Sequence, residues 1–289
     1  MPTVTIEGKT VTVPRESTIL AAARKAHVWI PTLCYHPTVP SLGSCRICMV
    51  EIVGSGGSSG RLVTACNYPV RRDITVSVSS ERAAQVRKGV MQLLLARAPE
   101  SKELQELAAR MGVEGTPYPT VTESQRNCIL CGLCVSVCEE VIGASAIGFA
   151  GRGVERVVAA PFREASETCI ACGACAAICP VGTIQVRIHA DTAEAEISPF
   201  KSRSKLLVCE ECGIRMVSVP VAQAMSDRVN IDWEEFRHLA RLCPECRRKH
   251  AAKALGFGAG EGSVTPLEKI KVNEVNEASK ASKTIEVKN

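Results

Sequence analysis

The sequence predicts an α+β protein made of several small metal-binding domains. Apolar and polar residues alternate near the N-terminus, which is the pattern of half-buried strands. Two later stretches repeat apolar residues at helical spacing, and sixteen cysteines fall into four groups of four. A chain of 289 residues is long enough for two or more compact units, each with its own core.

The cysteines sort into quartets with no residue left over. Tetrahedral iron and zinc sites need four thiolates, whereas disulfide pairing does not demand such groups. The recurring Cys-x2-Cys spacing also argues against cysteines scattered through a core as small hydrophobic residues. The quartets are Cys34, Cys45, Cys48 and Cys66; Cys128, Cys131, Cys134 and Cys138; Cys169, Cys172, Cys175 and Cys179; and Cys209, Cys212, Cys243 and Cys246.

The composition favours a reducing, cytoplasmic compartment. The N-terminal stretch MPTVTIEGKTVTVPRE has no apolar core and no twin arginine. No apolar run approaches the length of a membrane span, so we expect no direct membrane insertion. The net charge of +5 is modest, and the basic run at residues 247–253 has no interleaved aromatic residue, so we expect no nucleic-acid binding.

Residues 1–80 are predicted to form a β-grasp domain that binds a 2Fe-2S cluster. The alternation in residues 4–13 indicates a hairpin, and Ser17 is the expected N-cap of a helix that follows. A loop with three cysteines then leads into a strand, and a return strand supplies the fourth. Gly43 lets this loop pass close to the cluster, and the insert GSGGSSG is expected to be a flexible hairpin tip. The predicted ligands are Cys34, Cys45, Cys48 and Cys66.

Residues 81–118 are predicted to be a helical linker. The first helix is expected to bury Val86, Val90, Leu93 and Leu94 on one face, and Gly112 should stop the second helix.

Residues 119–200 contain the sequence pattern of a bacterial-type two-cluster ferredoxin. The run CILCGLCVSVC recurs 41 residues later as CIACGACAAIC, with Glu139 where the second copy has Pro180. In such folds each run lends its fourth cysteine to the other cluster. We therefore expect one 4Fe-4S cluster on Cys128, Cys131, Cys134 and Cys179, and a second on Cys138, Cys169, Cys172 and Cys175.

The motifs PTLCYHP, GSCRICMVE and the GRG turn at residues 151–153 resemble known iron-sulfur proteins. They are similar to the small diaphorase subunit of NAD-linked hydrogenases, and to the N-terminal region of the complex I large iron-sulfur subunit and of iron-only hydrogenases. The resemblance covers residues 2–200. Those large subunits usually carry a histidine and three cysteines for an additional cluster, and ARAPESKELQEL has neither residue type here. We expect that cluster to be absent.

Residues 201–258 are predicted to form a small zinc-binding module with four cysteine ligands. Two Cys-x2-Cys knuckles flank DWEEFRHLARL, which is typical of a helix, so zinc is favoured over rubredoxin-type iron and over a third cubane. This assignment leaves His238 and His250 as surface residues. Residues 259–289 are expected to be disordered or to dock on a partner. The predicted zinc ligands are Cys209, Cys212, Cys243 and Cys246.

Three cluster sites without a nucleotide or flavin motif indicate an electron relay that is not catalytic alone. The resemblance implies a hetero-oligomer, in which the chain connects a flavin-containing NAD(P)H-binding subunit with a catalytic partner such as a hydrogenase or formate dehydrogenase. One alternative is an iron-only hydrogenase fragment, although the quartets leave no cysteine for a catalytic iron site. The other is a redox-sensing regulator that binds protein or nucleic acid.

Overall fold

The computed structural model describes residues 1–54, 60–121 and 127–254. They divide into two compact units, one of residues 1–208 with 214–241, and one of residues 209–213 with the chain from Leu242 onward. Most of the predicted insert at residues 54–60, namely 55–59, and the tail at 259–289 lie outside the described residues. No helix in the described ranges is long and apolar enough to cross a membrane.

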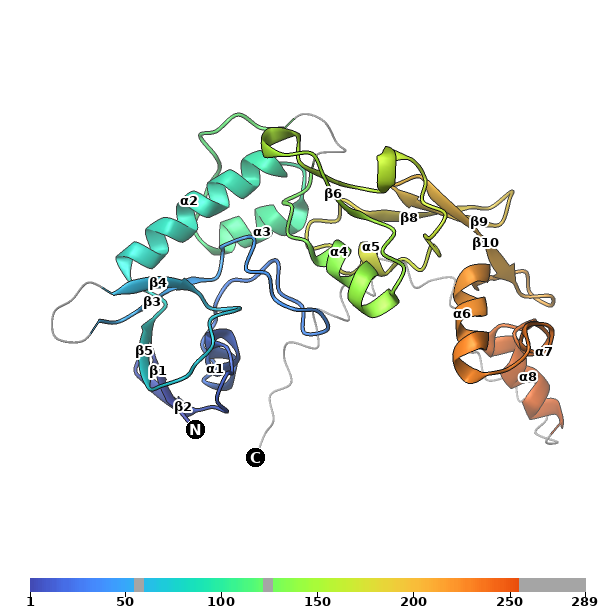
Figure 1. Cartoon of the computed structure of the whole chain (residues 1–289), viewed down its shortest axis with the longest axis horizontal. Helices are drawn as coiled ribbons and strands as arrows, with labels where there is room; N and C mark the ends of the chain where they lie inside the picture. Colours follow the sequence, from blue (N-terminus) through green and yellow to red (C-terminus); the bar gives the residue numbers. More distant parts are fainter. Residues whose placement is uncertain (55–59, 122–126, 255–289) are drawn as a thin grey trace. The chain divides into compact units, whose positions relative to one another are not determined.

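The N-terminal sheet has the mixed topology of a β-grasp fold (Figure 1). The strand order is β2-β1-β5-β3-β4, with β1 and β5 parallel and the other pairs antiparallel. The predicted hairpin is β1 and β2, and the helix after it is capped by Thr18 rather than by Ser17. The elements are β1 (Thr3–Ile6), β2 (Lys9–Thr12), α1 (Ile19–Lys25), β3 (Met49–Ile52), β4 (Arg61–Thr64) and β5 (Ile74–Ser77).

The linker is a helical pair, α2 (Glu81–Arg97) and α3 (Lys102–Arg110). The Ser80 and Ser101 side chains cap the N-termini, and Gly112 follows α3 at a φ of 70°. The predicted buried face of α2 was wrong in part, because Leu93 is 55% exposed while Leu95 is buried. Three consecutive apolar residues at 93–95 do not determine which face of α2 is buried. Packing of α2 against α3 and the cysteine loops determines it.

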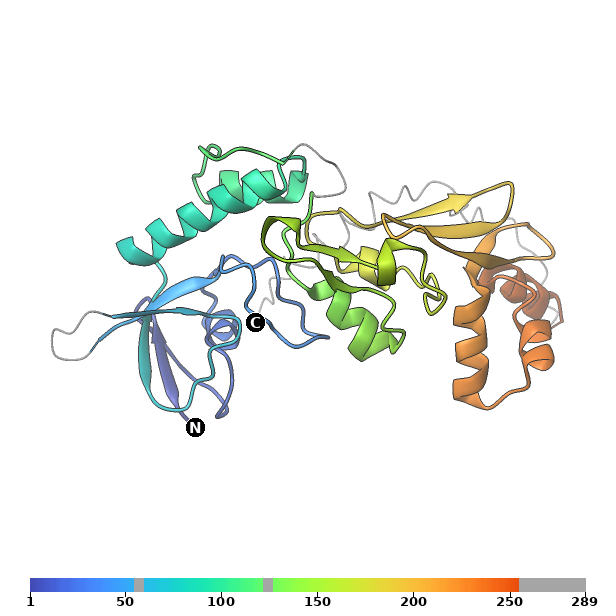
Figure 2. The same ribbon diagram turned by 45° about the horizontal axis from the view of Figure 1, so that its top comes forward.

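Two short helices mark the internal repeat (Figure 2). A four-stranded antiparallel sheet, ordered β11-β10-β9-β8, and the hairpin β6-β7 complete this region. The elements are α4 (Leu133–Ser136), the π-helix η2 (Val137–Ile142), β6 (Gly148–Ala150), η3 (Gly153–Glu155), β7 (Val157–Ala159), η4 (Pro161–Arg163), α5 (Ala174–Ala177), β8 (Gln185–His189), β9 (Glu194–Ser198), β10 (Ser202–Val208) and β11 (Arg215–Ser218).

Three helices follow the last strand. The first unit ends with α6 (Val219–Val229) and α7 (Trp233–Leu239), and α7 lies within the predicted DWEEFRHLARL helix. Helix α8 (Pro244–Ala254) belongs to the second unit.

Candidate iron-sulfur and metal sites

The four cysteines of the N-terminal domain lie buried close together. The Cys45 N–H donates to the Cys34 sulfur at 3.4 Å. Hydrogen bonds from neighbouring thiols lower the pKa of Cys34 to about 2 and that of Cys48 to about 7. The same contacts raise the pKa of Cys45 and Cys66. Two of the four sulfurs are thus favoured as thiolates, whereas Cys45 and Cys66 need a nearby positive charge to ionise, which iron would supply.

Two neighbours of this site support binding of a cluster. The Ser41 hydroxyl lies beside the Cys66 sulfur, is buried, and has no nitrogen or oxygen partner in the described ranges. The hydroxyl donates a hydrogen bond to that sulfur, which favours the Cys66 thiolate that a cluster requires. Gly43 has a φ of 63°, and a Cβ there would lie 2.6 Å from the Asn67 side chain. The left-handed φ favours glycine at this position, where the loop approaches Asn67 closely.

The two Cys-x2-Cys-x2-Cys loops have the same backbone conformation. Leu130 and Gly132 have φ values of 54° and 85°, and the matching Ala171 and Gly173 have 49° and 75°. Each loop then enters a four-residue helix, α4 or α5. A repeat in sequence is therefore also a repeat in geometry, including two left-handed positions that L residues seldom adopt.

The loops differ after the fourth cysteine. Glu139 allows the helix to run on from α4 through η2, whereas Pro180 cannot continue a helix. The Ala146 N–H, in the segment that follows η2, donates to the Cys138 sulfur at 3.4 Å and holds this cysteine in place.

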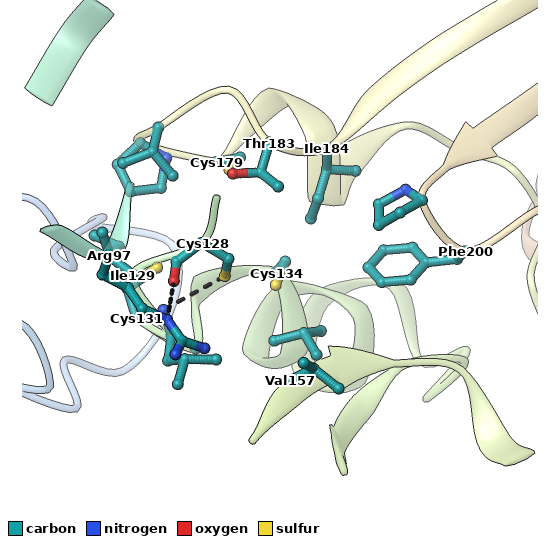
Figure 3. Close-up of a pocket in the computed structure, with 16 residues that line it drawn as sticks. Arg97, Cys128, Ile129, Cys131, Cys134, Val157, Cys179, Thr183, Ile184 and Phe200 are labelled. Carbon is teal, nitrogen blue, oxygen red and sulfur yellow. Dashed lines mark hydrogen bonds between the residues drawn. The ribbon is translucent and has the colours of Figure 1, made fainter. Parts of the chain in front are cut away.

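Two cavities bring the eight cysteines of the repeat together in crossed groups. The first cavity is shown in Figure 3, and the Leu130 N–H donates to the Cys128 sulfur there at 3.4 Å. Burial raises the pKa of Cys131 and of Cys175 to about 12, so ionised sulfurs need nearby positive charge, which iron supplies. The first cavity is lined by Cys128, Cys131, Cys134 and Cys179, and the second by Cys138, Cys169, Cys172 and Cys175.

The first cavity adjoins both other iron-sulfur sites. One hydrophobic core contains Cys34 and Cys45 together with Cys131, and it also includes residues of α2 and α3. A second core contains Cys134 and packs against Cys138, Cys169 and Cys175. The β-grasp site and the second cavity are thus each packed against the first cavity without an intervening domain.

The last quartet lies within the second unit. The sulfur atoms of this quartet all lie within 4.8 Å of one another, and they belong to Cys209, Cys212, Cys243 and Cys246. Backbone N–H groups of Cys212 and Cys243 lower the pKa of Cys209 to about 6. His250 is exposed and contacts Glu211 at 2.7 Å, and His238 is also exposed, as expected of surface histidines. The group therefore offers four sulfur ligands and no nitrogen ligand.

Comparison with known domains identifies the first two regions. Residues 1–81 match the 2Fe-2S iron-sulfur cluster binding domain, and residues 127–183 match the 4Fe-4S dicluster domain. The chain therefore contains both kinds of ferredoxin-type domain, as predicted.

Curated relatives share these regions. The chain is 35% identical to the NADPH-Fe(3+) oxidoreductase subunit alpha of Geobacter sulfurreducens over 180 residues, which cover 55% of this chain and 21% of that protein. It is 33% identical to the NADP-reducing hydrogenase subunit HndD of Solidesulfovibrio fructosivorans over 189 residues, which cover 56% and 32%. The mitochondrial NADH-ubiquinone oxidoreductase 78 kDa subunit of Candida albicans is 32% identical over 174 residues, covering 52% and 24%. The chain thus spans about a fifth to a third of these relatives.

A solved structure of an NAD+-reducing [NiFe]-hydrogenase in the H2-reduced state matches more completely. Its TM-score is 0.53 at 30% identity, and the match covers 63% of this chain and 85% of that chain. This chain belongs to the family of iron-sulfur subunits of NAD(P)-linked hydrogenases and complex I-like oxidoreductases. The resemblance found in the cysteine motifs is confirmed.

The structure places further residues at the proposed cluster sites that the cysteine motifs did not reveal. Ser41 and Asn67 lie at the first site, and Arg97 and Thr183 line the first cavity. Single serine, threonine and arginine residues carry no spacing signal, and Arg97 precedes the loop it contacts by 31 residues. Only the folded chain brings them to the cysteines.

Proposed function

We propose that this chain relays electrons between a flavin-containing NAD(P)H-binding subunit and a catalytic partner such as a hydrogenase or formate dehydrogenase. The observation that carries the proposal is the packing of the first cavity against both other iron-sulfur sites. The relatives include a NADP-reducing hydrogenase subunit and an NADPH-Fe(3+) oxidoreductase subunit, which supports a hetero-oligomer. A cytoplasmic, reducing setting suits sixteen cysteines in metal-binding quartets.

The proposed cofactors are one 2Fe-2S and two 4Fe-4S clusters. When bound, they would supply the one-electron redox chemistry that a relay needs. The chain's own residues hold the sulfurs, bury them and donate N–H groups to them. The proposed ligands are the buried β-grasp quartet and the two crossed groups, with Cys179 assigned to the first cavity and Cys138 to the second.

The loop around Cys172 is the proposed surface for electron exchange with a partner. Cys172 is exposed, whereas the other iron-sulfur cysteines are buried or half-buried. A Cβ on Gly173 would lie 3.2 Å from Val186 of β8, which is the edge strand of its sheet. Val186 and Ile188 are 41% and 58% exposed, so an apolar strip lies beside the loop. A partner protein that covers this strip would bring its own redox centre close to the second cluster site.

Zinc is proposed for the four-cysteine group of the second unit. Tetrahedral zinc with bonds of about 2.3 Å to sulfur separates the sulfurs by about 3.8 Å. The Cys212 and Cys243 sulfurs lie 3.7 Å apart. Helix α8 begins at Pro244, directly after Cys243, and the Cys246 N–H in its first turn donates to the Cys243 sulfur at 3.4 Å. Rubredoxin-type iron has the same ligand set, and metal analysis separates the two.

Metal content provides the first test. Anaerobically prepared protein should contain about ten irons, from one 2Fe-2S and two 4Fe-4S clusters, with one zinc. About eleven irons without zinc would indicate rubredoxin-type iron, and about fourteen would indicate a third cubane.

The relay itself is tested with nucleotides. The isolated chain should not be bleached by NADH or NADPH under anaerobic conditions, because hydride transfer needs a cofactor that accepts two electrons and releases them singly. Addition of a flavoprotein NADH dehydrogenase or of a low-potential chemical donor should bleach the clusters. Rapid bleaching by NADH alone would contradict the relay and point to a nucleotide site. Copurification from the native host then separates an oxidoreductase complex from the alternative of a redox-sensing regulator.

A further inference from the structure

Arg97 is the last residue of α2 and lines the cavity of the first crossed cysteine group (Figure 3). Its side chain is half-buried, so its charge acts in a less polar surrounding than bulk water. No cysteine motif includes this residue, and it belongs to the helical linker rather than to either ferredoxin-type domain.

The guanidinium joins two segments around the cavity. Its Nε donates to the Cys128 carbonyl oxygen at 3.1 Å, and its Nη2 donates to the Arg156 carbonyl oxygen at 3.0 Å. Arg156 immediately precedes β7, so one side chain connects α2, the first cysteine loop and the β6-β7 hairpin. The planar fork of arginine makes both bonds at once, which the point charge of lysine does less well.

We propose that Arg97 is a positioning residue that fixes the first cysteine loop and raises the reduction potential of the 4Fe-4S cluster held there. A cluster gains one negative charge when it is reduced, so a permanent positive charge beside it favours the reduced state. The inference rests on the proposed ligands of the first cavity.

The test is a redox titration of the full chain followed by EPR spectroscopy. In Arg97→Gln the ratio of reduced to oxidised first cluster should fall about tenfold at a fixed potential, which corresponds to about 59 mV for one electron. Arg97→Lys keeps the charge and should stay within about threefold of the native ratio. Arg87→Gln is the matched control, because Arg87 lies on the same helix and donates to the Met49 carbonyl oxygen at 2.8 Å. It should leave the ratio for the first cluster unchanged.

Equal ratios in the native protein and in Arg97→Gln would overturn the proposal, as would equal tenfold losses in the Gln and Lys variants. If Arg97→Gln loses iron, the Arg97→Lys variant provides the test. A ratio of reduced to oxidised first cluster within threefold of native would support an effect of the positive charge on the potential, and a tenfold change would contradict it. Loss of the first cluster from both variants would make Arg97 purely structural and overturn the proposal. A wrong ligand set is recognised separately, because Cys179→Ser would then leave the EPR signal of the first cluster intact.

Discussion

Glu7 shows how one side chain can join the first turn of the β-grasp domain to the chain that follows its last strand. It follows β1 at a φ of 48°, and its carboxylate accepts hydrogen bonds from the backbone of Val78 and Ser79 and from two serine hydroxyls. Burial alone would raise its pKa, but these donors outweigh burial and lower the pKa below its ordinary 4.5. The carboxylate thereby holds the β1-β2 turn against the chain that leads into α2.

Glu7→Gln should destabilise the domain by about 1 kcal/mol at neutral pH, a value reduced for the exposure of the side chain. Because the pKa is lower in the folded state, the charged form stabilises the fold above about pH 4.5 and this contribution disappears as the pH falls through the folded-state pKa. Denaturation curves of both proteins should therefore converge at acid pH. Glu16→Gln is the control, since the Glu16 side chain makes an exposed ion pair with Arg71 and should change stability by less than about 0.5 kcal/mol. A difference between native protein and Glu7→Gln that grows toward low pH would contradict this account.

Crossed ligation is tested by pairs of cysteine variants. Cys179→Ser should remove the same EPR signal as Cys128→Ser, although the two residues lie in different motifs, because both line the first cavity. Cys138→Ser should likewise match Cys169→Ser. If Cys179→Ser instead removes the signal that Cys169→Ser removes, each motif holds its own cluster and the assignment is wrong.

At the scale of elements, glycine has opposite roles in a cysteine loop and in a helix. Gly132 has a φ of 85°, and a Cβ there would lie 2.8 Å from the Leu42 side chain, which belongs to the loop of the β-grasp cysteines. Gly89 lies within α2, and a Cβ there would meet nothing within 4 Å. Gly132 thus allows close approach of two cysteine loops, whereas Gly89 only loosens a helix.

Gly132→Ala and Gly89→Ala should therefore shift stability in opposite directions. The first should lose about 1 kcal/mol because an L residue strains the left-handed backbone, and the exposed Leu42 side chain can move aside. The second should gain about 0.5–1 kcal/mol from better helix propensity. Thermal loss of the visible cluster absorbance measures both, with about 2–4 °C expected per kcal/mol. A stabilising Gly132→Ala would show that the loops are not closely packed there.

At the scale of the whole molecule, we expect the second unit to depend on a bound metal. Among its described residues, 209–213 and 242–254, the buried side chains are those of Cys209, Cys243 and Cys246. So small an apolar core cannot maintain a fold without a metal or another cross-link. The first unit has three hydrophobic cores of its own.

Cys246→Ser should therefore release the zinc and expose α8 to proteolysis, while the iron-sulfur spectra of the first unit stay unchanged. Zinc release is measured with a colorimetric chelator, and cleavage sites by mass spectrometry. His250→Ala is the control and should keep the metal, because the site already has four sulfur ligands. Parallel loss of iron from the first unit would show that the two units do not fold independently.

Spacing in the sequence was enough to predict the two ferredoxin-type domains and the helical linker, because metal ligation and helix periodicity are local rules that show in neighbouring residues. The cap at Thr18 and the buried face of α2 were missed, since each depends on how an element packs against distant ones. The contact of Leu42 with Gly132 and the bonds of Arg97 to Cys128 and Arg156 join residues that are far apart in the chain. Only the tertiary structure could decide them, because side-chain packing and charge act through space and leave no periodic pattern in the sequence.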